Sequence, residues 1–310
     1  MSDTCKAQPH GWIILDKPVG LGSTQAVGAV KRNFREAGYS KIKVGHGGTL
    51  DPLASGVLPV ALGEATKLAG RLLDSDKAYA FTIRFGEETA TLDAEGEVVA
   101  TSPVRPTPRA LEAVLPRFTG PIAQVPPAYS ALKVDGARAY DLARAGQEVT
   151  LASRDVVVHS LTLPSPALTE ELEEVTLLAH VSKGTYIRSL ARDIAHALGT
   201  VGHVTMLRRV KAGPFDLTDA ISLDKLAELG HARRLEQHLL PLRAGLDDIP
   251  ALPLTPDQAG ALRQGRVLAG IAADAVRDGG QAFAMLGDTP VALVEVRDQE
   301  VRVVRGFNLE

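Results

Sequence analysis

Apolar side chains recur along the chain with two periods, and the shorter period predicts strands. GWIILDK reads as a strand that ends near Lys17. In KAYAFTIRFG the apolar residues fall at every second position, which places them on one face of a strand. These residues are Tyr79, Phe81, Ile83 and Phe85. EVTLLAHVS and VTMLRRV predict two further strands in the second half of the chain.

The longer period, close to that of an α-helix, predicts several helices between these strands. Ser23 is placed to cap a helix that runs through Ala37. GEATKLAGRLLD and TYIRSLARDIAHALG also read as helical, and another helix is expected near 107–118. The segment at 120–148 begins as an extended loop and turns helical near Ala137. Strands and helices in this irregular order fit the α+β class.

The last quarter of the chain has a different pattern. PLRAGLDDIPALPLTP, at 241–256, is rich in proline and lacks a clear period, so we interpret it as a linker. Three short strand candidates follow, QAFAML, PVALVEV and EVRVVRGF, with the turns GDTP and RDQE between them. This spacing predicts a small β-barrel or sandwich. The length of 310 residues suits two domains, which we expect at 1–245 and 251–310.

Composition is that of an ordinary globular protein, with 45% hydrophobic and 23% charged residues. Cys5 is the only cysteine, which excludes an intrachain disulfide. The first residues lack the basic and apolar regions of a signal peptide. No apolar stretch approaches the roughly 20 residues that a membrane helix needs. We therefore expect a cytoplasmic protein with no attachment to a membrane.

Charge is distributed unevenly along the chain. The formal net charge of -3 argues against a uniformly basic surface for nucleic acid, but it allows a local basic patch. The first fifty residues carry seven basic and three acidic side chains, and MLRRVKAG at 206–213 carries three basic and no acidic ones. Acidic residues gather elsewhere, as in TEELEE at 169–174.

Several kinds of catalytic site have no motif in this sequence. H-x-E and C-x-x-C, which zinc deaminases need, are absent, and so are H-E-x-x-H and a Walker A loop. Position 53 is Leu, so Ser55 does not sit in G-x-S-x-G. We expect neither a metal nor a nucleotide cofactor, and we assign any chemistry to side chains alone.

The stretch GHGGTLDPLASG, at 45–56, is the strongest candidate for such chemistry. Asp51 and Pro52 could simply begin a turn of helix, because Asp is a favoured N-cap and Pro a favoured first residue. Alternatively, the glycines allow a ligand close to the backbone, and the carboxylate serves as nucleophile or base. The pattern alone leaves both interpretations open.

Six segments, in the same order, resemble the motifs of the TruB family of tRNA pseudouridine synthases. They are DKPVGLGS (16–23), GHGGTLDPLASGVLPVALGEATK (45–67), DKAYAFTIRFG (76–86), QVPPAYSALKVDGARAYDLARAG (124–146), VSKGTYIRSLARDIAHALG (181–199) and MLRRVKAGPF (206–215). The resemblance covers about 11–250 densely, and the C-terminal part resembles the family's PUA domain more loosely. Gly47 stands where the family usually has Thr, and Gly22 where it usually has Thr or Ser.

The resemblance implies the pseudouridine synthase fold, which is a central mixed, largely antiparallel sheet followed by a small β-barrel-like PUA domain. It implies isomerisation of uridine to pseudouridine at position 55, in the T loop of tRNA, without a cofactor. The enzyme would bind the T arm and elbow as a monomer and require no protein partner. A tRNA-binding chaperone with incidental catalysis is the alternative. A guide-dependent relative acting on ribosomal RNA is a third possibility, which the ending GFNLE argues against because such relatives usually carry basic tails.

The resemblance also assigns roles to individual residues. Asp51 is the nucleophile, Arg188 the cation that keeps it ionised, and Tyr79 the residue that stacks on the target base. From pattern alone, Arg188 reads as an exposed helix arginine and Tyr79 as a core aromatic. Substrate contacts are expected from His46, Lys67, Tyr186 and Leu207, and from Lys133, Arg138 and Arg144 in the insertion at about 120–148.

Overall fold

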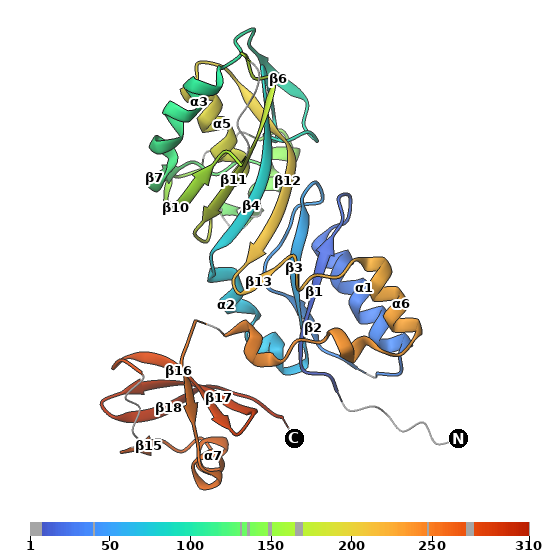
Figure 1. Cartoon of the computed structure of the whole chain (residues 1–310), viewed down its shortest axis with the longest axis vertical. Coiled ribbons are helices and arrows are strands. Elements are labelled where there is room, and N and C mark those ends of the chain that lie inside the picture. The colour runs from blue at the N-terminus through green and yellow to red at the C-terminus, as the bar shows by residue number, and fades with distance from the viewer. Residues whose placement is uncertain are drawn as a thin grey trace.

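A computed structural model describes residues 8–39, 41–130, 132–134, 137–147, 151–164, 170–246, 248–270 and 276–309. At 133–134 and 137–138 it describes the backbone only, and Cys5 lies outside the described residues. Figure 1 shows a central sheet with helices beside it and a smaller sheet formed by the C-terminal part of the chain. The expected α+β class is confirmed. In the part of the chain that is described, no helix is long and apolar enough to cross a membrane.

Among the described residues, nine strands form the central sheet, and seven of them follow the order β1-β3-β12-β4-β11-β10-β7. Strand β2 pairs with β3, and β13 pairs with β12. These strands are β1 (Gly11–Lys17), β2 (Val44–His46), β3 (Ser55–Leu62), β4 (Lys77–Phe85), β7 (Gly120–Gln124), β10 (Arg154–Thr162), β11 (Glu174–Val181), β12 (Gly202–Ala212) and β13 (Phe215–Asp216). The pairing of β12 with β3 is parallel and the others are antiparallel, so the sheet is mixed and largely antiparallel, as expected.

Strand β12 lies between β3 and β4, two strands that follow each other in the chain. It pairs with β4 along most of its length, but it meets β3 only where Arg208 faces Ser55 and Arg209 faces Gly56. A Cβ atom on Gly56 would lie 2.2 Å from the carbonyl oxygen of Arg209, so only glycine permits this approach. The sheet thus has two parts, one formed by β1, β2 and β3 and the other by β12 and the strands beyond it. The contact between Gly56 and Arg209 joins these two parts at the end of the glycine-rich loop.

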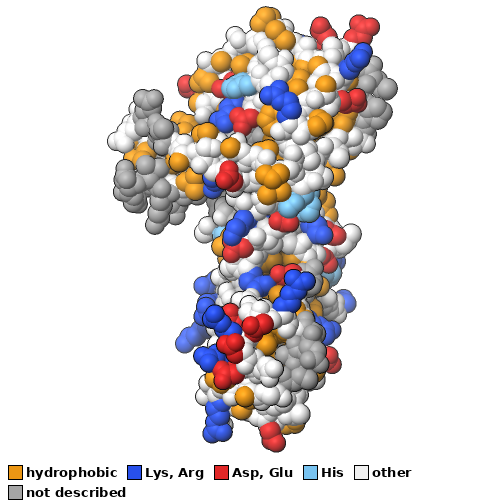
Figure 2. Space-filling model, turned by 90° about the vertical axis from the view of Figure 1, so that its left-hand side faces the viewer, with side chains coloured by type: hydrophobic (Ala, Val, Ile, Leu, Met, Phe, Trp, Pro, Cys, Tyr) orange, Lys and Arg blue, Asp and Glu red, His pale blue; other side chains and the backbone are white. Residues whose placement is uncertain are grey.

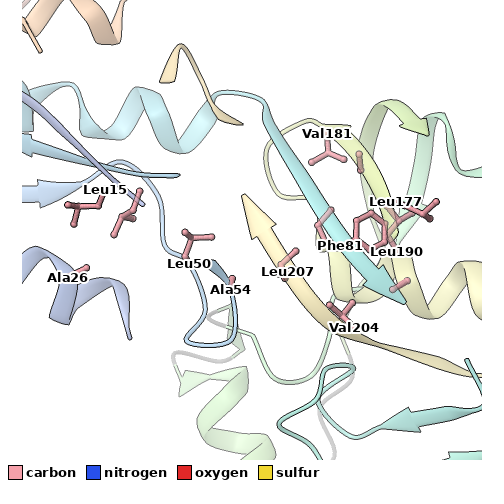
Figure 3. Close-up of a cluster of buried hydrophobic side chains, with 14 of the residues drawn as sticks. Leu15, Ala26, Leu50, Ala54, Phe81, Leu177, Val181, Leu190, Val204 and Leu207 are labelled. Atoms are coloured by element: carbon pink, nitrogen blue, oxygen red, sulfur yellow. The ribbon is translucent and has the colours of Figure 1, made fainter. Parts of the chain in front are cut away.

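Helices cover both parts of the sheet (Figure 1). Helix α1 (Ser23–Glu36) packs against α6 (Leu223–His231) beside β1 and β3, while α5 (Ile187–Ala197) packs on β4 and β12. Buried apolar side chains from β1 to α5 form one cluster, part of which is drawn in Figure 3. The other described helical segments are α2 (Ala69–Asp74), α3 (Pro108–Val114), α4 (Ala139–Arg144), α7 (Pro256–Arg263) and the short 3₁₀ segments η1 (Gly63–Lys67), η2 (Leu115–Phe118), η3 (Leu235–His238) and η4 (Leu242–Gly245).

Two small two-stranded sheets lie outside the central one. Strands β5 (Glu87–Thr89) and β6 (Val98–Thr101) form the first, and β8 (Lys133–Val134) and β9 (Ala137–Arg138) form the second. The second belongs to the expected insertion, in which α4 begins near the predicted position. The prediction of an extended loop at 120–124 is wrong, because β7 pairs with β10 in the central sheet.

The described part of the C-terminal sheet has five strands in the order β14-β16-β17-β18-β15 and is curled into a half-barrel. They are β14 (Ala251–Pro253), β15 (Leu268–Ala269), β16 (Gly280–Leu286), β17 (Thr289–Arg297) and β18 (Glu300–Gly306). The three strands predicted after residue 256 are confirmed.

The interpretation of 241–256 as a plain linker is wrong. This segment contains η4 and β14, and the side chains of Leu242 and Leu246 are buried. They pack with Trp12 of β1 and with Phe283 and Phe307 of the C-terminal part. The Trp12 indole also donates a hydrogen bond to the Leu242 carbonyl, at 3.1 Å. The segment therefore forms part of a hydrophobic cluster that connects the two sheets.

Candidate active site

The loop between β2 and β3 carries Asp51 in a tight turn. The Ala54 amide donates to the Asp51 carbonyl at 3.0 Å, and the chain enters β3 at Ser55. No helix begins here, so the interpretation of Asp51 as a helix cap is wrong. Leu50 and Ala54 are buried on either side of Asp51 and anchor the turn in the core, as Figure 3 shows.

The first turn of α5 places Arg188 against this loop. One of its terminal nitrogens lies 3.0 Å from Asp51 Oδ2, and the other lies 3.2 Å from Asp93 Oδ2. The guanidinium also donates to the carbonyls of Thr91, at 2.9 Å, and Tyr129, at 3.1 Å. The Arg188 side chain is only 8% exposed, so its interpretation as an exposed helix arginine is wrong.

The two carboxylates on Arg188 differ in their surroundings. Asp51 is 46% exposed, whereas Asp93 is 4% exposed and also accepts hydrogen bonds from the Thr91 hydroxyl and the Glu95 amide. The sequence analysis missed Asp93, which lies in the turn between β5 and β6, where neither periodicity nor a motif marks it. The accessible carboxylate is therefore Asp51, with a buried cation beside it.

A cleft of about 980 Å³ opens at this ion pair. The structure brings six of the predicted site residues together along it: Asp51, Tyr79, Arg144, Tyr186, Arg188 and Leu207. Tyr79 lies on β4 beside β12 and is partly buried against the core, so its roles in the core and at the cleft are compatible. Leu207 lies on β12 opposite Phe81 and contributes an apolar side chain to the cleft.

Two predicted contacts with described side chains, His46 and Lys67, do not line this cleft. The His46 imidazole accepts from the Gly48 amide at 3.3 Å, and burial, followed by the charge of Arg209, lowers its pKa. Lys67 is bound to Glu64, at 2.7 Å, and to the Gly306 carbonyl, at 2.9 Å, which ties η1 to the C-terminal sheet. The side chains of Lys133 and Arg138 lie outside the described residues.

Neighbouring segments hold the Asp51 loop in place. The Ser23 hydroxyl accepts from the Leu50 amide at 2.8 Å and donates to the Leu50 carbonyl at 2.9 Å. Gly22, not Ser23, occupies the cap position of α1, so the predicted capping role of Ser23 is wrong. Lys17 is fully buried and donates to two carbonyls of the loop before α1, and burial lowers its pKa although Asp51 opposes this effect.

Of the two departures from the family motifs, Gly47 has a clear local cause. A Cβ atom there would lie 2.6 Å from a methyl carbon of Leu72, so the Leu72 side chain fills the space next to the loop. At Gly22 a Cβ atom would meet only Gln25 Oε1, at 3.4 Å, which is an ordinary contact. Among the described side chains, no cluster of three or more His, Cys, Asp or Glu residues could bind a metal ion.

Two family models match the chain in succession. The model for the N-terminal domain of TruB family pseudouridylate synthases matches residues 32–187. The model for the C-terminal domain of tRNA pseudouridylate synthase B matches residues 188–247. Together they span the central sheet except for its first strand, and they end before the C-terminal sheet.

Relatives of known function are similar over nearly the whole length. The tRNA pseudouridine synthase B of Novosphingobium aromaticivorans is 65% identical over 301 residues, which are 97% of this chain and 98% of the relative. That of Zymomonas mobilis subsp. mobilis is 62% identical over 301 residues, with 96% of each chain covered.

Solved structures show the same fold. A Cbf5-Nop10-Gar1 complex contains a chain with a TM-score of 0.73 and 27% identity, matched over 96% of this chain and 85% of that one. An H/ACA RNP bound to a substrate RNA containing 2'-deoxyuridine contains another, with a TM-score of 0.71, 25% identity, and 97% and 86% coverage. With the site geometry and the near full-length relatives, these likenesses establish that the chain belongs to the TruB family of pseudouridine synthases and isomerises uridine to pseudouridine in tRNA.

Proposed function

We propose that the protein modifies the T-loop uridine at position 55 of tRNA and that Asp51 is its nucleophile. The observation that carries this proposal is the ion pair of the accessible Asp51 with the buried Arg188 at the end of the cleft. A nucleophilic carboxylate must be ionised, and an adjacent cation favours the ionised form. The guanidinium of Arg188 supplies this cation and is itself held by the buried Asp93.

The isomerisation needs no cofactor, because atoms and electrons balance within the nucleotide. The bond from C1′ to N1 breaks, the base turns over, and a bond from C5 to C1′ forms. C5 then loses its proton, and N1 gains a proton in the product. Attack of Asp51 on the sugar and attack on the base both fit this balance.

Tyr79 and Leu207 hold the base during this rearrangement. Both side chains line the cleft beside Asp51, Tyr79 from β4 and Leu207 from β12. An aromatic ring stacks on a flipped base, and an apolar side chain covers its other face and excludes water. Tyr79 also assists removal of the C5 proton, for which a phenol needs support from its surroundings.

The insertion grips the T arm and elbow. Within it, the Tyr129 and Tyr140 rings contact each other edge to face, and Arg144 lies over the Tyr140 ring at 5.2 Å. These three side chains line the cleft and combine the stacking surface and the charge that extruded nucleotides need. Lys133, Arg138 and His46 remain proposed RNA contacts, and Tyr186 supports the site. The protein acts as a monomer, without a protein partner, in the cytoplasm, where it meets tRNA.

The distribution of surface charge fits recognition of tRNA by its shape rather than by a uniformly basic surface. On the face drawn in Figure 2, Lys and Arg side chains are interspersed with Asp and Glu over the lower part of the molecule. The formal net charge of -3 agrees with this mixture. We propose that the C-terminal sheet, which resembles a PUA domain, contacts the acceptor end of the tRNA.

The test uses an unmodified tRNA transcript with tritium at uridine C5. The native protein releases tritium from the T-loop uridine, and Asp51→Asn binds the tRNA with similar affinity but releases none. A transcript with cytidine at position 55 serves as the substrate control. Turnover of Asp51→Asn near the native rate would exclude Asp51 as the nucleophile, and release from another uridine would exclude position 55.

A further inference from the structure

A second arginine, Arg209, lies beneath the Asp51 loop and has no role in the proposed chemistry. It belongs to β12, where its backbone faces Gly56. Its side chain is only 1% exposed, which makes it one of the largest fully buried side chains. A buried guanidinium is costly unless its donors are bonded, so its partners reveal what it stabilises.

The partners of Arg209 lie on both sides of Asp51. Its Nε donates to the Val57 carbonyl at 2.8 Å, one terminal nitrogen to the Thr49 carbonyl at 3.2 Å, and the other to the Gly48 carbonyl at 3.1 Å. The planar guanidinium has a fixed geometry, so these bonds also fix the carbonyls relative to one another. A single side chain thereby fastens the chain before and after the turn.

The composition of the loop explains why it needs this support. The stretch at 45–56 contains four glycines, and glycine loses more conformational freedom on folding than any other residue. Burial of Leu50 and Ala54 holds the turn from the core side, and Arg188 contacts the carboxylate itself. Arg209 instead holds the backbone, through acceptors that a glycine-rich segment still provides.

We propose that Arg209 is a positioning residue for the isomerisation, because it fixes the backbone turn that presents Asp51 to the uridine. It touches neither the substrate nor the reacting atoms. The inference rests on the proposed nucleophilic role of Asp51. Displacement of a reacting group by about 1 Å costs roughly 10²-fold in rate, so a looser turn lowers kcat while tRNA binding persists.

Arg209→Met tests this role, because methionine is buried readily but cannot donate to the three carbonyls. We expect kcat to fall about 10²-fold in multiple-turnover assays with unmodified tRNA, and KM to change less than about threefold. Hydrogen exchange of residues 45–56 should become faster, while that of β4 stays unchanged.

Arg208→Met is the matched control. Arg208 is the preceding residue of β12, and its guanidinium pairs with Asp16 at 3.0 and 2.8 Å. This guanidinium touches the 45–56 stretch only through the Ser55 hydroxyl, at 3.4 Å, and contacts none of the carbonyls that Arg209 holds. Because this pair is partly exposed, its loss should change kcat and KM by less than about threefold. Arg209→Lys keeps the positive charge but lacks the planar guanidinium. It should lower kcat as Arg209→Met does, with a smaller loss of stability.

Three results would overturn the inference: native kcat in either folded Arg209 variant, a rise in KM that accounts for the whole loss of kcat/KM, or failure of both variants to fold. The last result would assign Arg209 to the stability of the fold alone. Asp51→Asn, assayed in parallel, separates the two proposals. Native turnover in Asp51→Asn would show that Asp51 is not the nucleophile. Lost turnover in Asp51→Asn together with native turnover in Arg209→Met would reject only the positioning role of Arg209.

Discussion

At the scale of single residues, the site depends on one guanidinium shared between two carboxylates. Both line the cleft, but Asp93 is buried and takes further hydrogen bonds, whereas Asp51 is accessible. Because Asp93 already compensates the buried charge of Arg188, Asp51 can leave its ion pair to react without leaving an isolated cation in the interior. With Asp51 as the proposed nucleophile, the two residues divide the tasks of stabilising Arg188 and of reacting with the substrate.

Asp93→Asn tests this division. The amide keeps the shape but removes the buried negative charge, so Arg188 should bind Asp51 more tightly and make it a poorer nucleophile. We expect kcat to fall by roughly 10- to 10²-fold and the free energy of unfolding to fall by about 3 kcal/mol. Single-turnover rates and urea titration measure the two effects. Unchanged turnover would mean that Asp93 has no influence on Asp51.

The contact between Gly47 and Leu72 gives a second prediction. In Gly47→Thr the new side chain clashes with Leu72, and we expect a loss of about 1–3 kcal/mol in the free energy of unfolding. Leu72→Ala in the same chain should make the threonine less costly, so the two losses should not be additive. Gly28→Thr is the control, because a Cβ atom at Gly28 meets nothing within 4 Å. Additive losses would show that Leu72 does not exclude threonine.

At the scale of elements, the start of α1 and the Asp51 loop are joined through one hydroxyl. Ser23 satisfies both backbone groups of Leu50, the residue before Asp51. The Gly20 amide adds a bond to the Pro52 carbonyl at 2.8 Å. Helix α1 and the segment before it therefore support the turn from the side opposite α5.

Ser23→Ala should weaken this support. Two buried backbone groups lose their partner, which costs about 1–3 kcal/mol, and kcat should fall with them. Ser222→Ala is the matched control, because the Ser222 hydroxyl caps α6 at 3.1 Å from the Lys225 amide and its loss should cost about 1 kcal/mol without affecting kcat. Urea unfolding and turnover assays compare the two variants. Equal kcat in both variants would show that the contact between α1 and the Asp51 loop does not affect catalysis.

Periodicity in the sequence predicts elements better than it predicts their partners. Strand β4 follows from its alternating apolar residues, and α5 from its helical spacing. Strand β3, SGVLPVAL, is buried on both faces and contains Pro59, so no alternation marks it. The parallel contact between β3 and β12 joins segments far apart in the chain, which periodicity does not record.

Prediction of the active site from the sequence has the same limit: motifs identify single residues but not their partners in space. Asp51, Tyr79 and Arg188 follow from motifs, and the structure brings them to one cleft. Asp93 lies in a turn with ordinary turn residues, and Arg209 stands in an otherwise typical strand, so their positions are apparent only once the sheet is assembled. Lys67 stands within a motif, yet its contacts are with Glu64 and the C-terminal sheet.

At the scale of the whole molecule, the two sheets share a hydrophobic cluster. Trp12 and Phe215 from the central part pack in this cluster with Phe283 and Phe307 from the C-terminal part. Arg71 adds polar contacts to Asp248, at 2.8 Å, and to Gln281. An interface that combines an apolar cluster with hydrogen bonds couples the unfolding of the two parts.

We expect calorimetry to show one unfolding transition for the whole chain. Phe283→Ala removes a large side chain from the shared cluster and should lower the free energy of unfolding by about 3–5 kcal/mol while the transition stays single or begins to split. Val304→Ala, at an exposed position of the same sheet, should have little effect. Two separate transitions in the native protein would show that the parts unfold independently.

The central position of β12 has a consequence for biosynthesis. This strand fills the place between β3 and β4, although 127 residues (212 − 85) are translated between the end of β4 at Phe85 and the end of β12 at Ala212. At roughly 5–20 residues per second, β3 and β4 wait about 6–25 seconds on the ribosome with their facing edges unpaired. During that interval the β12 partner of these strand edges has not yet been made. The Asp51 carboxylate lacks its partner Arg188, and the Thr49 carbonyl lacks its partner Arg209, until these residues have been synthesised. In the proposed mechanism, the growing chain therefore completes its active site only after β12 has been translated and has paired with β3 and β4.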